Sequence, residues 1–86
     1  MLPYRITEIH AKAGILQDVH LSILNRPCQI LSLEKGQRGW LLVDVGDTLF
    51  GPHRISISPI HSIINTESNE IHIETENSIY LLVKEK

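Results

Sequence analysis

The sequence predicts a small all-β fold: a barrel of five or six strands of SH3-like or related type, or a compact sandwich. Three observations indicate it. The 86 residues are rich in isoleucine and leucine, with one Phe, one Trp and two Tyr. Apolar and polar residues alternate at a period of two in several short segments. Turn residues separate these segments every ~8–12 positions. A barrel is the economical form because closure leaves no unpaired edge strand.

The length allows one domain over residues 1–86. Cys28 is the single cysteine, so an intramolecular disulfide is impossible and a reducing compartment is favoured. The chain starts without the basic and apolar stretch of a signal peptide, and no apolar run reaches the ~20 residues that span a bilayer. We therefore expect a cytoplasmic protein with no membrane partner.

The second half of the chain gives the clearest strands. Residues 53–58 alternate isoleucine with polar residues. Pro59 lacks an amide hydrogen, which predicts a corner or an edge position. Residues 60–64 resume the strand, and a polar turn follows at 65–70.

The turn into the last strand decides which of its side chains face inward. Residues 71–76 place Ile71 and Ile73 on one face and His72 and Glu74 on the other. A two-residue loop, 76–77, would align the apolar residues Ile79, Leu81 and Val83 with His72 and Glu74. A three-residue loop, 76–78, aligns them with the two isoleucines. We expect the three-residue loop, which puts Tyr80 and Leu82 on the outer face.

The middle of the chain reads as another hairpin, 28–34 and 40–47, around the turn 35–39. If the inner residues are Leu41, Val43 and Val45, then Trp40 and Leu42 face outward. An outward tryptophan is uncommon unless something covers it. Two interpretations of Trp40 therefore stay open, a binding residue on the surface or a core residue covered by the N-terminal segment.

The first quarter of the chain predicts its secondary structure less clearly. Residues 4–10 predict a strand, with Thr7 and Ile9 on one side and Ile6 on the other. Residues 15–24 fit both a strand and a helix. The all-β surroundings favour a strand, and a short helix near 15–24 is the alternative.

Two histidines and a glutamate are the candidate metal ligands. If Ile64 opposes Ile71, His61 opposes Glu74, and His72 lies on the same outer face. Two imidazoles and a carboxylate are a legitimate ligand set for zinc. However, a sheet face offers no concavity, and outward positions are commonly polar. We favour a simple His61–Glu74 surface pair and expect no metal and no cofactor.

No other motif indicates an enzyme. Cys28 lies at a predicted strand start without an activating motif, which is typical of a buried, inert cysteine. Phosphate-cradling glycine loops and paired carboxylates in an evident cleft are absent from the sequence pattern.

Nucleic-acid binding is the alternative function. Lys35 and Arg38 flank a glycine-marked turn, and Arg26 lies nearby in sequence, so a modest basic patch is an alternative use of this region. The formal net charge of −2 opposes it, because phosphate backbones demand a basic excess.

A protein-interaction module requires no special catalytic or ligand-binding motif in the sequence. An outer strip of Trp40, Leu42, Tyr80 and Leu82 would supply the aromatic residues that dominate binding hot spots. We therefore expect a non-enzymatic interaction module that contacts a partner protein or a second copy of itself, in the manner of a regulator or inhibitor.

Overall fold

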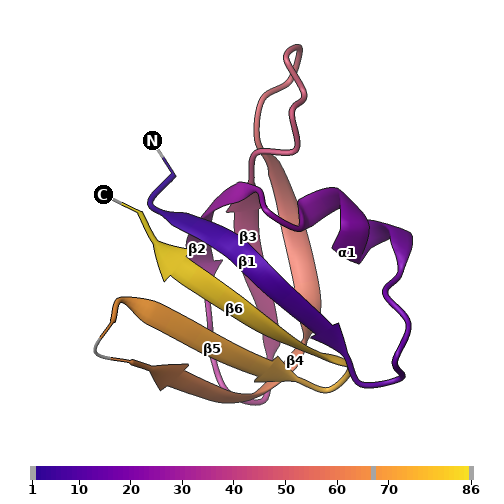
Figure 1. The fold of residues 1–86 in the computed structure, drawn as a ribbon, viewed down its shortest axis with the longest axis vertical. Coiled ribbons are helices and arrows are strands. Elements are labelled where there is room, and N and C mark those ends of the chain that lie inside the picture. The colour runs from indigo at the N-terminus through magenta and orange to yellow at the C-terminus, as the bar shows by residue number, and fades with distance from the viewer. Residues whose placement is uncertain (1, 67, 86) are drawn as a thin grey trace.

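The computed structural model describes residues 2–66 and 68–85. Within them, the strands are β1 (Tyr4–Ala11), β2 (Pro27–Ser32), β3 (Arg38–Val43), β4 (His53–Asn65), β5 (Glu70–Thr75) and β6 (Ser78–Lys84), and the helix is α1 (Asp18–Ile23). Neighbouring strands pair antiparallel in chain order, and β6 pairs with β1 to close the barrel (Figure 1). The prediction of a small all-β barrel is confirmed.

The helix α1 corrects our preference for a strand over residues 15–24, where the short helix was the alternative. His20 and Ile23, three positions apart, share one side of the helix and are both buried. Asn25 follows with a left-handed backbone (φ 63°), and its N–H donates to the Ile6 carbonyl at 2.7 Å. No helix in the described part of the chain is long and apolar enough to cross a membrane.

Strand β4 serves both halves of the barrel because it bends at Pro59. Its first part pairs with β3 and its second part with β5, and the register shifts at the bend. Ile57 and Ile60 therefore both point inward although they are three positions apart. The predicted corner at Pro59 matches this bend.

Strand β1 uses a similar device. The register with β6 shifts between Ile6 and Glu8, which makes Thr7 the extra residue. Both Ile6 and Ile9 are buried as a result, whereas strict alternation put them on opposite sides.

The turn between β5 and β6 is the two-residue loop Glu76–Asn77, so the prediction of a three-residue loop is wrong. Glu74 pairs with Ile79 and His72 with Leu81. Thr75 and Ser78 hold the turn: the Thr75 hydroxyl donates to the Ser78 carbonyl and accepts from its N–H, both at 3.0 Å. Apolar residues occupy both faces of β6, so alternation alone could not choose between the two registers.

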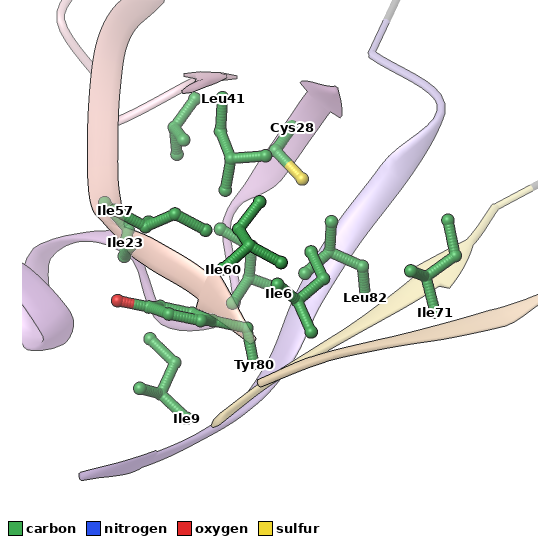
Figure 2. Packing of buried hydrophobic residues seen from close by; sticks show 12 residues of the cluster. Ile6, Ile9, Ile23, Cys28, Leu41, Ile57, Ile60, Ile71, Tyr80 and Leu82 are labelled. Carbon is green, nitrogen blue, oxygen red and sulfur yellow. The ribbon is translucent and has the colours of Figure 1, made fainter. Parts of the chain in front are cut away.

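The core is consequently built around Tyr80 and Leu82, which we expected on the surface. They are 4% and 0% exposed, among the isoleucines and leucines contributed by the other strands (Figure 2). Leu41 and Val43 point inward as predicted, and Val45 packs against the cluster. The prediction of which side chains point inward is thus correct for β3 and wrong for β6, where the two faces are exchanged.

Candidate functional site

The loop between β3 and β4 projects from the end of the barrel (Figure 1). Its tip carries Leu49 and Phe50, and each is 80% exposed. Two adjacent large apolar side chains at this exposure are unusual for a loop, because loops are commonly polar.

Asp47 fixes the backbone at this tip. Its Oδ1 accepts the N–H groups of Leu49 and Phe50 at 2.9 and 3.0 Å. Its Oδ2 lies 2.8 Å from His53 Nε2, and the Gly51 N–H donates to its carbonyl at 3.0 Å. Hydrogen bonds from the Phe50 amide, His53 and the Leu49 amide hold the pKa of the Asp47 carboxyl below its usual range. One carboxylate therefore organises the loop and presents its two apolar side chains.

Trp40 and Leu42 lie on the outer face of the hairpin that carries this loop, as their strand pattern predicts. Trp40 is 39% exposed, and the Arg54 guanidinium stacks 5.6 Å from its ring centroid. Leu42 is half-buried and pairs with Arg54 across the strands. The predicted strip therefore keeps these two members and loses Tyr80 and Leu82 to the core.

The candidate metal ligands do not come together as the register predicted. Ser62 rather than His61 opposes Glu74, and Ile64 opposes His72, because His61 lies at an irregularity of β4. Glu74 instead pairs with Lys12 at 2.7 Å, and this lysine lowers the pKa of the Glu74 carboxyl, with a smaller effect from His61. Within residues 2–66 and 68–85, no group of three or more His, Cys, Asp or Glu side chains could hold a metal ion.

Cys28 is fully buried in the core. Desolvation raises the pKa of its thiol to about 12, so it stays protonated at neutral pH. A protonated, enclosed thiol is no nucleophile.

His20 and Ser78 form a buried pair that the sequence did not predict, because 58 positions separate them in the chain. Ser78 Oγ lies 3.2 Å from His20 Nε2, which has the appearance of a nucleophile and its base. However, His20 Nδ1 accepts the Gln17 N–H at 3.1 Å. The proton of the neutral ring is therefore on Nε2, which donates to Ser78 and cannot take its proton. Ser78 is also 1% exposed, so the pair is structural.

His20 and Tyr80 instead line a cavity of about 310 Å³ beside α1. The two rings meet edge to face, with centroids 6.1 Å apart. Burial raises the pKa of the Tyr80 hydroxyl, and the nearby Ser78 side chain offsets part of that rise. Such a volume is at the small end of ligand sites, which begin at about 300 Å³.

The three cations considered for nucleic acid lie at two ends of β3. Lys35 bridges to Ile60 and Arg38 pairs with Pro59, at the start of the strand. The Arg26 guanidinium lies against Gly46, beyond the strand's other end. A six-residue strand spans ~20 Å, so these cations form no single basic patch.

The comparisons with known proteins give no relative. The chain matches no protein-family model, no curated protein and no solved structure.

Proposed function

We propose that the protein is a non-enzymatic interaction module that binds a partner protein through the β3–β4 loop. The observation that most directly supports this proposal is the pair Leu49 and Phe50, each 80% exposed on a loop organised by Asp47. Burying a leucine or phenylalanine side chain contributes about 1.5–3 kcal/mol. A loop already held in one conformation loses less entropy on binding, so more of that energy remains as affinity.

The chemistry around the tip describes the partner's surface. Asp44 and Asp47 lie in the loop, where each carboxylate accepts a backbone N–H. The Arg26 guanidinium lies against Gly46, between the two. Charges of both signs therefore lie near the tip, which favours a partner whose apolar pocket has a polar rim of mixed charge. Trp40 and Leu42 on the same hairpin offer further apolar contact. By covering such a pocket, the domain would act as a regulator or inhibitor of its partner.

Photo-crosslinking tests this proposal. The full chain is produced in its native cells with p-benzoylphenylalanine at position 50 or, as a control, at position 64. Ile64 is also an exposed apolar residue, at 58%, but lies near the far end of β4. We expect position 50 to give one dominant adduct, identified by mass spectrometry, that position 64 lacks.

Each outcome of this experiment is decisive. A dominant adduct with a different protein supports a hetero-complex, and an adduct with a second copy supports self-association through the same loop. Identical adduct patterns at the two positions, or no adduct at position 50, would overturn the proposal.

A further inference from the structure

The cavity beside α1 is lined by two cationic side chains and by several polar ones. Lys12 and Arg38 are its charged residues, and no Asp or Glu is among the described residues that line it. The other polar residues of the lining are Gln17, His20, Ser56, Ser58, Asn77 and Tyr80. Such a lining favours a ligand that carries negative charge and accepts hydrogen bonds.

The hydrogen bonds already made at the rim increase this bias. Ser56 Oγ accepts from Arg38 at 3.5 Å, and Ser58 Oγ accepts from Asn77 Nδ2 at 2.8 Å. None of the described residues accepts the proton of either hydroxyl, so both serines can donate to a ligand. Ser56 and Ser58 both line the cavity, so their hydroxyls can contact the same bound group.

The charge of the site matches a monoanion. Lys12 is neutralised by Glu74 at 2.7 Å. Arg38 forms no ion pair with any described residue, which leaves one uncompensated positive charge at the cavity. A guanidinium pairs with a carboxylate through two parallel hydrogen bonds.

Part of the cavity wall is apolar. Ile15 and Val19 lie at the cavity with 77% and 44% of their surface exposed, while Ile57 is buried. A ligand with an apolar body would cover the exposed part of this wall, which adds hydrophobic stabilisation to the ion pair.

We propose that this cavity binds a carboxylate attached to an apolar body, with Arg38 as the anchor of the carboxylate. The group belongs either to a free aliphatic acid or to the C-terminus of a peptide with apolar final residues. This site is separate from the β3–β4 loop, so the two proposals stand or fall independently.

The test is a titration of the full ¹⁵N-labelled chain followed by NMR. Hexanoate represents the free acid and N-acetyl-Leu-Phe the peptide terminus, each beside its uncharged amide. We expect the carboxylates to shift the backbone signals of Ile57 and Asn77 and to bind about tenfold or more tighter than their amides. Tighter binding of hexanoate assigns the site to free acids, and tighter binding of the dipeptide assigns it to peptide termini.

Arg38→Gln should weaken carboxylate binding about tenfold or more, and Arg38→Lys should retain part of the affinity. Arg54→Gln is the matched control, an arginine on the adjacent strand that stacks on Trp40 and does not line the cavity. The same spectra report whether each variant is folded. Equal binding of acids and amides, unchanged affinity in Arg38→Gln, or no binding at millimolar concentration would overturn the proposal.

Discussion

At the scale of single residues, several side chains have roles that depend on one or two close contacts. Asp47 is the clearest case, because its carboxylate accepts two backbone N–H groups and pairs with His53. Its neighbours in sequence are a glycine and a threonine, so nothing in the sequence distinguishes Asp47 from an ordinary polar loop residue. Only the folded backbone brings the partners within reach.

The ionisation of Asp47 predicts a pH dependence of the loop. The pKa of its carboxyl lies below the ordinary value of 3.8, chiefly because the Phe50 amide donates to it. The carboxylate therefore stabilises the loop fully at pH values above 3.8, and that stabilisation is lost as the pH falls through the lowered pKa. The Leu49 and Phe50 amide shifts should titrate with this lowered midpoint and should lose the transition in Asp47→Asn. A midpoint at or above 3.8 would contradict the hydrogen-bond assignment.

Cys28 predicts a lack of chemical reactivity. With its side chain fully buried and its pKa raised to about 12, the native thiol should not react with a disulfide reagent at pH 8. The same reagent should label it rapidly in denaturant. Labelling of the native protein at a rate similar to that of the unfolded chain would show that the core is open at this point.

At the scale of the elements, the β5–β6 turn determines the inward face of β6. Leu82 is 0% exposed and Leu81 is half-buried on the outer face. Leu82→Ala should lower the free energy of unfolding by about 2–5 kcal/mol, because it leaves a cavity in the core. Leu81→Ala should lower it by about 1 kcal/mol or less. Urea denaturation of the two variants measures the difference, and equal losses would argue for a different register.

Gly39 leaves room for the core side chains of Ile57 and Ile60, which pack directly over it. A Cβ at this position would lie 2.9 Å from Ile57 Cγ1 and 3.0 Å from Ile60 Cδ1. Gly39→Ala should therefore destabilise the protein by about 1–3 kcal/mol. Combined with Ile57→Ala, it should cost less than the sum of the two single changes, because the second change removes the clash. Additive losses in urea denaturation would show that this contact does not limit the position.

At the scale of the whole molecule, two-residue periodicity predicted the barrel and the inward residues of β3 and β5. This periodicity failed where a strand contains an extra residue, as at Thr7 and His61. One extra residue moves every later side chain of the strand to the opposite face. The periodicity also failed for β6, where both faces are apolar and the turn length decides the register.

Less of the site than of the fold was predictable. The outward position of Trp40 was one of two alternatives left open, and the structure places both Trp40 and Leu42 on the outer face, where β3 is regular. Leu49 and Phe50 were missed. Two large apolar residues between Asp47 and Gly51, in a segment expected to be a loop, do indicate an exposed apolar site. The cavity beside α1 had no such signal, since its residues come from four separate stretches of the sequence, within 11–20, at 38, at 56–58 and within 77–80, that only the closed barrel brings together.

We expect the β3–β4 loop to supply most of the binding energy of the domain. The most direct measurement is the dissociation constant for the partner identified by crosslinking, using wild type, the Leu49→Ser/Phe50→Ser double variant and the exposed control Ile64→Thr. The double variant should bind about 30-fold or more weakly, equivalent to about 2 kcal/mol, while Ile64→Thr should bind like wild type. A double variant that is folded and binds as tightly as wild type would contradict the claim.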